Sequence, residues 1–525
     1  MPRRLRVGGV YREKRTPSQR ALSGSSRPAK RLSTVPFPSI SAVPHSGHVA
    51  DMAEPSRPDI CIVGAGALGI ALAQHARALG AAVLLVDRGI AEPGDATEQS
   101  LRLASLQASA ARAHAIRGAG QFGINSGAAK ISMRAVQERA HGIGRSSAPL
   151  TSRDSLTALG IDVVRGETRF ADPNSLLIGD MQYRPRSIIL ATGAIPVVPT
   201  IPGLDQIDFF TPDTILDNTR KLTHLLVLGD DEPAYVLAQA ASRLGAEVTL
   251  VPQGRALTSY DRESADILLD TLRAEGVRIL DGSAVTEIVP RTQGIGAVVS
   301  LPDGEVTALD LSHVLVATGR VSDLSGLDIE VARWKPQHAH YAAGGLGETT
   351  NRRIRVVGPA AGITQWQHGL RHGKAVIEAI VLGRASHAVP PSPKLVMTDP
   401  PLAQIGQLPA TDAKLRPGHH LYRESFVENA QARASGQGGG LAKLVINAKG
   451  QIVGAALVGP AAPELAAVLA VAMERGIPAS DLASLSLPSP SLFELLVRMG
   501  QRHKAGQAPS AWAQRIGSLR RSLRI

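Results

Sequence analysis

The stretch PDICIVGAGALGIALAQHARALGAAVLLVDRG, residues 58–89, decides the fold of the first part of the chain. An apolar run leads into Gly64, Gly66 and Gly69. An alanine-rich segment of helical spacing follows, and a second apolar run ends at Asp87. This pattern predicts a strand, a helix and a second, parallel strand. Gly64 would permit a tight turn, Gly66 would let the backbone approach a pyrophosphate at the helix N-terminus, and Gly69 would let helix and strand pack closely.

The acidic residue after the second strand completes a dinucleotide-binding motif. Asp87 follows Gly69 by 18 residues, at the place where a carboxylate accepts a hydrogen bond from a ribose hydroxyl. The chain has one cysteine, Cys61, within the first apolar run. We interpret it as a small core residue, and the absence of a possible disulfide within the chain indicates a reducing compartment, the cytoplasm.

A second unit of the same type, HLLVLGDDEPAYVLAQAASRLGAEVTLV, spans residues 224–251. Two such units among alternating strand and helix patterns predict a doubly wound α/β protein. The second glycine turn is altered, because it keeps Gly229 but has Asp231 and Ala234 where glycines are expected. Asp231 as an N-cap, with Pro233 in the first turn, would start a stable helix without any ligand.

Size and charge narrow the class of protein. The chain has 525 residues, 44% of them hydrophobic, which predicts two or three domains. The net charge of +12 is confined to the ends, because residues 1–51 carry +8 and residues 501–525 carry +6. A nearly neutral body with 3% aromatic residues argues against nucleic-acid binding. No uncharged apolar run is long enough for a transmembrane segment.

The two ends of the chain are basic. Residues 1–56 are rich in Arg, Ser and Pro and predict a disordered extension, which is either a transit peptide or the product of a translation start upstream of Met52. Residues 501–525 predict a basic amphipathic tail, which packs on its own domain or a partner subunit or makes a peripheral membrane contact. Its apolar residues at helical spacing are Trp512, Ile516, Leu519 and Leu523.

Further motifs follow in a fixed order. They are GETRFADPNSLLIGDMQYRPRSIILATGAIPVVPTIPGL (166–204), VLVATGR (314–320), TTNRRIRVVGPAAG (349–362), SPKLVMTDPPLAQIG (392–406) and GLAKLVINAKGQIVGAALVGPAAPELAAVLAVAMERG (440–476). In this order they resemble the pyridine nucleotide-disulfide oxidoreductases, the group of dihydrolipoamide dehydrogenase and mercuric reductase. The resemblance covers about residues 57–500.

The resemblance implies a specific architecture. Two Rossmann-like dinucleotide-binding domains precede a C-terminal α+β dimerisation domain, through which family members pair as homodimers. The FAD-binding domain would comprise residues 57–200 and 324–386, the NAD(P)-type domain residues 201–323, and the dimerisation domain residues 390–500. The sequence LAKLVINAKGQIVGAALVG independently predicts a hairpin with a turn at Lys449 and Gly450.

The redox cysteines of the family are missing. Relatives have two cysteines five positions apart, followed by a lysine, at the start of a helix. In GDATEQSLRLASLQASA, residues 94–110, Asp95 and Ser100 stand at the cysteine positions and Ala104 at the lysine. Neither a carboxylate nor a hydroxyl cycles between thiol and disulfide, so we expect no dithiol chemistry.

The acid–base pair of the family is also altered. Relatives have His-Pro followed by a glutamate, and here these positions are Ser489, Pro490 and Glu494. Serine does not titrate near neutral pH, and Glu494 is equally explained as an acid at a helix N-terminus. Val236 replaces the glutamate that pairs with the missing lysine. Losing both partners is coherent, because either one alone would be a buried unpaired charge.

The flavin motifs are better preserved, and the resemblance implies FAD as the cofactor. The Gly-Asp pair that holds the ribityl chain in relatives is here Gly358-Pro359. Binding of NAD(P) is doubtful, because residues 230–232 bring three negative charges to the second helix start. We interpret Trp366 and His368 as core or surface residues, and the pair His338 and His340 as no metal site. The expected FAD-binding residues are Gly64, Gly66, Gly69, Asp87, Ala191, Thr192, Gly193 and Gly358.

Two functions are compatible with these observations. The first is an FAD-dependent oxidoreductase that passes electrons from NAD(P)H or another small-molecule donor through flavin to a non-thiol acceptor. The second is a non-catalytic paralogue that acts as a dimeric scaffold or flavin-binding subunit. The joint loss of catalytic positions favours the second and the retained flavin motifs favour the first, which we prefer.

Overall fold

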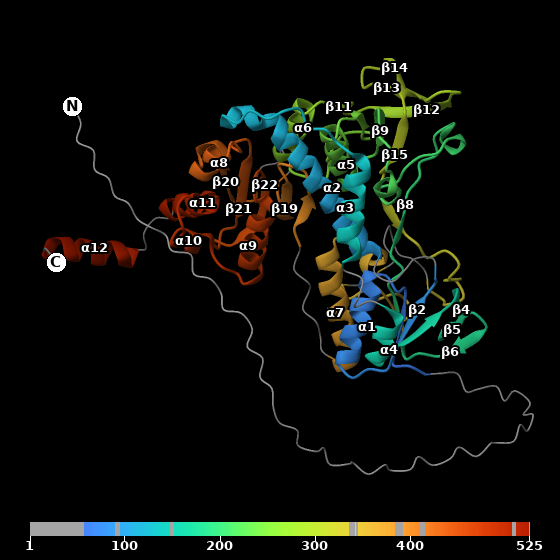
Figure 1. Ribbon diagram of the computed structural model, residues 1–525. Helices are drawn as coiled ribbons and strands as arrows, with labels where there is room; N and C mark the ends of the chain where they lie inside the picture. The colour runs from blue at the N-terminus through green and yellow to red at the C-terminus, as the bar shows by residue number, and fades with distance from the viewer. Residues whose placement is uncertain are drawn as a thin grey trace, which may run out of the picture. The chain divides into compact units, whose positions relative to one another are not determined.

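The computed structural model describes most of the chain beyond its first 56 residues. The described ranges are residues 57–89, 95–146, 152–334, 342, 345–383, 392–409, 415–506 and 511–523. The predicted N-terminal extension, His338 and His340 lie outside these ranges. Figure 1 shows the described helices and strands, many of them labelled.

The first predicted strand–helix–strand unit is the centre of a parallel five-stranded sheet. The strand order is β17-β7-β1-β2-β3, so β17 joins the sheet from far along the sequence. This arrangement agrees with a domain built from two sections of chain. Helix α7 packs beside α1 (Figure 1). The bounds are β1 (Ile60–Val63), α1 (Ala67–Ala78), β2 (Val83–Asp87), β3 (Asp162–Arg165), β7 (Ser187–Leu190), β17 (Ile354–Val356) and α7 (Trp366–Leu382).

Between β2 and β7 the chain forms helices and a small antiparallel sheet. Helix α2 packs against α3 and also against α5 of the second unit. The strands β4, β5 and β6 form the small sheet. The bounds are α2 (Asp95–Gly118), α3 (Met133–Arg145), α4 (Arg153–Ala158), β4 (Thr168–Asp172), β5 (Ser175–Ile178) and β6 (Met181–Tyr183).

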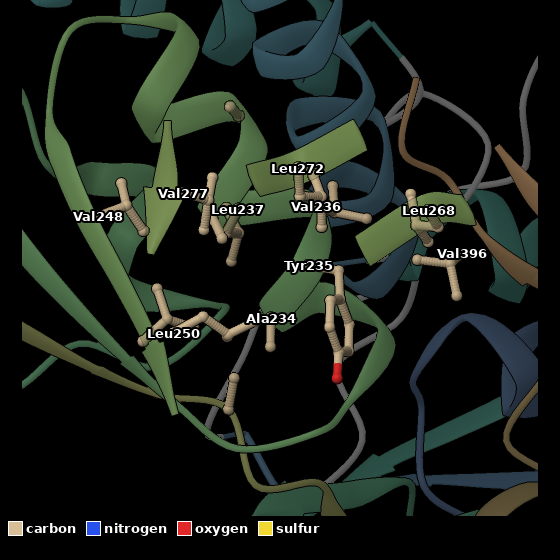
Figure 2. Close-up of a cluster of buried hydrophobic side chains, with 14 of the residues drawn as sticks. Ala234, Tyr235, Val236, Leu237, Val248, Leu250, Leu268, Leu272, Val277 and Val396 are labelled. Atoms are coloured by element: carbon tan, nitrogen blue, oxygen red, sulfur yellow. The ribbon is translucent and has the colours of Figure 1, made fainter. Parts of the chain in front are cut away.

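The second unit forms its own parallel sheet, with strand order β11-β10-β9-β15. Its helix α5 is buried along most of its length, and Figure 2 shows Tyr235, Val236 and Leu237 within its core cluster. The chain enters the second unit through β8 and leaves it through β16, and these two strands pair antiparallel. The bounds are β8 (Ala194–Pro196), β9 (His224–Leu228), α5 (Glu232–Arg243), β10 (Glu247–Val251), α6 (Arg262–Ala274), β11 (Val277–Ile279), β12 (Ala284–Pro290), β13 (Ile295–Ser300), β14 (Val306–Leu311), β15 (His313–Val316) and β16 (Arg320–Ser322).

The C-terminal part forms a five-stranded sheet with strand order β18-β19-β22-β21-β20, covered by helices. The predicted hairpin is confirmed, because β21 pairs antiparallel with β22 and Gly450 in the turn has a φ of +78°. The bounds are β18 (Lys394–Val396), β19 (Leu402–Gly406), β20 (His420–Ser425), α8 (Ala430–Ala434), β21 (Leu441–Ile446), β22 (Ile452–Val458), α9 (Ala462–Glu474), α10 (Ala479–Leu482), α11 (Glu494–Ala505) and α12 (Ala511–Leu523).

An ion network around the buried Arg243 joins the second unit to the segment before β19. Arg243 is 4% exposed, and its Nε and Nη2 donate to the carboxylate of Glu275 at 2.7 and 2.6 Å. Its Nη1 donates to Asp399 Oδ2 at 2.8 Å, just before β19 begins. The predicted α/β class, with two Rossmann-like units and a C-terminal α+β domain, is therefore confirmed.

Candidate functional site

In the first glycine turn, packing requires glycine at two positions and leaves room for a side chain at the third. Gly64 has a φ of +114°, and a Cβ there would lie 2.4 Å from the carbonyl oxygen of Ala191. A Cβ on Gly69 would lie 1.8 Å from the carbonyl oxygen of Gly64. A Cβ on Gly66 would have no atom within 4 Å. Gly66 is therefore free of packing constraints, as a backbone that a phosphate group approaches must be.

The N-terminus of α1 has no side-chain cap. Gly66 is the N-cap residue, no side chain accepts a hydrogen bond from the first N–H groups, and the first turn contains no acidic residue. These N–H groups and the positive end of the helix dipole form an anion site. A dinucleotide pyrophosphate would supply the acceptors that this helix start lacks.

Asp87 is the last residue of β2 and keeps one carboxylate oxygen available. Its Oδ1 accepts a hydrogen bond from the backbone N–H of Gly89 at 2.8 Å. This bond fixes the carboxylate at the carboxyl end of the sheet. No described group donates to Oδ2, which suits a ribose hydroxyl.

The three-residue turn after β7 closes over the first glycine turn. The backbone N–H of Ala191 donates to the carbonyl of Val63 at 2.9 Å, and Gly193 has a φ of +74°. The Oγ1 of Thr192 is buried and has no hydrogen-bond partner among the described atoms. A buried hydroxyl without a partner costs free energy, so this position is suited to a bound group that completes it.

Gly358, in the segment similar to the second flavin motif of the family, also lies beside the start of α1. It has a φ of +61°, and a Cβ there would lie 2.8 Å from Cδ2 of Leu68 in the first turn of α1. The residue that follows is Pro359, which has no carboxylate. The structure therefore gathers Gly64, Gly69, Ala191 and Gly358 around the start of α1, and these residues fit FAD.

The residues that the resemblance aligns with the redox cysteines of relatives lie on α2. Asp95 is the first residue of this helix, and Ser100 and Ala104 are exposed farther along it. Cys61 is fully buried in β1, and this burial raises the pKa of its thiol far above the usual value. Cys61 therefore cannot replace the missing thiols, and its interpretation as a core residue is confirmed.

The structure places Ser489 beside Glu494. The Oγ of Ser489 donates to Oε1 of Glu494 at 3.4 Å, and Glu494 is the first residue of α11. Serine thus keeps a contact with the glutamate but supplies no group that titrates near neutral pH. Val236, at the position of the missing glutamate, is 3% exposed in the core shown in Figure 2.

The second helix start is filled by the protein's own carboxylates. Asp231 is the N-cap of α5, and its Oδ1 accepts from the N–H of Glu232 at 3.0 Å. The Oε1 of Glu232 accepts from the hydroxyl of Tyr260 at 3.0 Å. Asp230 accepts from the hydroxyl of Tyr235 and, at 2.7 Å, from the N–H of Leu257.

These contacts do not fit a dinucleotide. Burial is the main cause that raises the pKa of Asp230, Asp231 and Glu232 above the usual range of carboxyl groups. Asp231 is the N-cap of α5 and Pro233 lies in its first turn, as predicted from the sequence. Gly229 serves packing, because a Cβ there would lie 2.1 Å from the carbonyl oxygen of Ala317.

Tyr235, Tyr260 and Arg320 were missed by reasoning from the sequence. The two tyrosines lie in and after α5 and carry no motif of their own. Arg320 follows the second three-residue turn and donates to Asp213 Oδ2 at 2.7 Å, and its charge partly offsets the rise that burial causes in the pKa of Asp231. Only the folded arrangement brings these side chains to the second helix start.

Comparison with known proteins identifies the family. The family model described as pyridine nucleotide-disulphide oxidoreductase matches residues 56–373, and the model of its dimerisation domain matches residues 392–499. The chain belongs to the pyridine nucleotide-disulphide oxidoreductase family. Members of this family are FAD-dependent flavoproteins, and the first site fits that cofactor.

Relatives within this family include enzymes of two activities. A mercuric reductase from Staphylococcus aureus is 25% identical over 83% of this chain and 80% of its own length. A dihydrolipoyl dehydrogenase from Thermus scotoductus is 27% identical over 84% of this chain and 96% of its own length. Among solved structures, the HOCl-induced flavoprotein disulfide reductase RclA from Escherichia coli shares the fold. It has a TM-score of 0.73 and 21% identity over 84% of this chain and 99% of that chain.

The described residues contain neither a candidate membrane-spanning helix nor a candidate metal-binding cluster. None of the described helices combines the length and the apolar character needed to cross a membrane. Within the same ranges, no group of three or more His, Cys, Asp and Glu side chains could hold a metal ion.

The dimerisation-domain match indicates a homodimer.

Proposed function

We propose that the protein is an FAD-dependent oxidoreductase that passes electrons through its flavin to a non-thiol acceptor, such as a quinone or oxygen. The uncapped start of α1 beside the open position at Gly66 carries this proposal. Bound flavin would supply two-electron and one-electron chemistry that needs no protein thiol.

The protein's own residues would hold the cofactor and keep it oriented. The first N–H groups of α1 would bind the pyrophosphate, and Asp87 would bind the ribose. The buried hydroxyl of Thr192 would complete its hydrogen bonds against the bound cofactor. Pro359 offers no carboxylate to accept a hydrogen bond from the ribityl chain, which would weaken the hold on the cofactor by about 1.5–3 kcal/mol.

We propose a donor other than NAD(P)H. The carboxylates of Asp230, Asp231 and Glu232 oppose a second pyrophosphate and already use the hydrogen-bond donors around α5. The donor and the acceptor would then both be small molecules that reach the flavin directly.

The single buried cysteine agrees with a reducing compartment, the cytoplasm.

The visible absorption spectrum of the purified protein tests this function. We expect a flavin band that persists under anaerobic conditions after addition of NADH or NADPH. Chemically reduced protein should then reoxidise with a water-soluble quinone but not with lipoamide or glutathione disulfide. A colourless protein would refute the proposal and favour the non-catalytic scaffold, whose support is the joint replacement of cysteines, lysine and histidine. Reduction of a disulfide substrate would refute the non-thiol acceptor.

A further inference from the structure

The C-terminal helix α12 combines an apolar face with basic residues that pair with no carboxylate in the part of the chain that the structure describes. Positions 512, 516, 519 and 523 recur every three or four residues and so share one face of the helix by register. They are occupied by Trp, Ile, Leu and Leu. Leu519 is 62% exposed, which makes it one of the most exposed large apolar residues that the structure describes.

Arginines stand on both sides of this face. At about 100° per residue, Arg515 lies about 60° to one side of the apolar face and Arg520 about 60–80° to the other. Arg515, Arg520 and Arg521 are exposed, and none of the three pairs with a carboxylate among the described residues. Residues 501–525 contain six basic residues and no acidic one.

Hydrogen bonds that involve the described side chains of α12 are local. Ser518 donates to the carbonyl of Arg515 at 2.8 Å, and Ser522 donates to the carbonyl of Leu519 at 2.8 Å. In contrast, Arg502 of the preceding helix α11 contacts the buried carboxylate of Glu424 at 3.0 Å. Arg502 of α11 thus pairs with a carboxylate inside the fold, whereas the described arginines of α12 are exposed to solvent.

We propose that α12 binds the surface of an anionic lipid membrane. Arginines that flank an apolar face keep their guanidinium groups at the lipid headgroups while the apolar side chains enter the acyl boundary. A nucleic acid or an acidic protein surface would satisfy the arginines but leave the four apolar residues in water. Helix α12 has 13 residues, about 20 Å, so it would lie on the membrane and not span it.

This inference is independent of the flavin chemistry, because lipid binding is measured without donor or acceptor. The assay is co-sedimentation of the purified full-length protein with vesicles of phosphatidylcholine alone or mixed with phosphatidylglycerol. We expect binding to the mixed vesicles only, weakened by salt. The double substitution Arg515→Gln and Arg520→Gln, at the two positions that flank the apolar face, should weaken it about 25-fold, since each arginine near an anionic surface contributes about fivefold.

A matched pair of single substitutions tests the apolar face. Leu519→Glu and Ser518→Glu each add one negative charge to neighbouring positions, but only position 519 lies on the apolar face. We expect Ser518→Glu to weaken vesicle binding about fivefold through charge alone. Leu519→Glu should weaken it at least about tenfold more, because it also removes a leucine side chain from the acyl boundary.

Three results would overturn the proposal. Equal loss in the two variants would mean that the apolar face does not enter the lipid. Equal binding to neutral and mixed vesicles would remove the role of the arginines. The third result has two parts: the parent protein binds no vesicles, and Leu519→Glu dissociates a dimer in sedimentation velocity. It would mean that the apolar face contacts the partner subunit.

Discussion

The hydroxyl of Tyr260 donates a hydrogen bond of 3.0 Å to Oε1 of Glu232 at the start of α5. This contact holds a carboxylate at a helix start of the kind that binds a nucleotide phosphate in the first unit. Two further carboxylates, of Asp230 and Asp231, lie next to it in sequence and are partly buried. The second Rossmann-like unit therefore satisfies its own helix start, while the first leaves its helix start to a ligand.

The crowding of these carboxylates makes stability depend on pH. Burial raises the pKa of Asp231 in the folded protein above its value in the unfolded chain. The ionised group therefore destabilises the fold at neutral pH, and this cost is relieved as the pH falls through the raised folded-state pKa. Asp231→Asn keeps an N-cap acceptor but removes the charge. We expect a higher urea midpoint than the parent at pH 7 and a difference that shrinks toward about pH 4.

An exposed carboxylate provides the control for this experiment. Asp270 on α6 is 74% exposed and pairs with Arg273 at 2.8 Å. Asp270→Asn should change the free energy of unfolding by less than about 1 kcal/mol at either pH. A parent protein more stable than Asp231→Asn at pH 7 would contradict the destabilising role of the buried charge.

A second prediction concerns the ion network around Arg243. Arg243→Met would remove the two charged hydrogen bonds to the carboxylate of Glu275, 9% exposed, and leave it only the longer contacts from Gln239 Nε2 at 3.2 and 3.3 Å. Removing one partner of a buried pair costs about 3–5 kcal/mol, which urea unfolding would measure. Arg273→Met is the control, because its pair with Asp270 is exposed and should cost less than about 1 kcal/mol. Equal effects of the two substitutions would show that the buried network does not stabilise the fold.

The sequence predicted the glycine turns because their chemistry is local. Gly69 serves a contact with Gly64 within one strand–helix unit, and the N-cap role of Asp231 depends only on neighbouring residues, whereas the contact of Gly64 with Ala191 forms only in the folded sheet. The partners of Glu232 and Arg243 could not be predicted. Tyr260 lies 28 residues from Glu232, and Asp399 lies 156 residues from Arg243, so only the packing of separate elements brings them together.

The contact between Ser489 and Glu494 yields a third prediction. Because serine does not titrate near neutral pH, the pair cannot act as the proton shuttle of a dithiol enzyme. Ser489→Ala removes the 3.4 Å hydrogen bond but no titrating group. We expect the rate of flavin reoxidation by a quinone to change less than about twofold, with the same pH profile, in a stopped-flow experiment. A tenfold loss with an altered pH profile would give Ser489 a role in proton transfer.

The fourth prediction separates flavin binding from folding at the first glycine turn. Gly66 has a φ of −69°, and a Cβ there would meet no atom within 4 Å, so Gly66→Asp fits the fold. An aspartate N-cap would even raise the stability of the apoprotein by a few tenths of a kcal/mol. Its carboxylate would nevertheless occupy the phosphate position and repel the pyrophosphate. We expect loss of the flavin absorption band with an apoprotein unfolding midpoint equal to or above that of the parent.

Gly69→Ala tests the opposite case in the same turn. Its Cβ would lie 1.8 Å from the carbonyl oxygen of Gly64, a backbone atom that can move only if α1 shifts from β1. We expect the apoprotein to lose about 1–3 kcal/mol of stability, whether or not flavin is present. If Gly66→Asp instead retained full flavin absorbance, the pyrophosphate would not lie at the start of α1, and the site that carries the proposed function would be wrong. If Gly69→Ala were neutral while Gly66→Asp unfolded the protein, the division between packing and ligand glycines would be reversed.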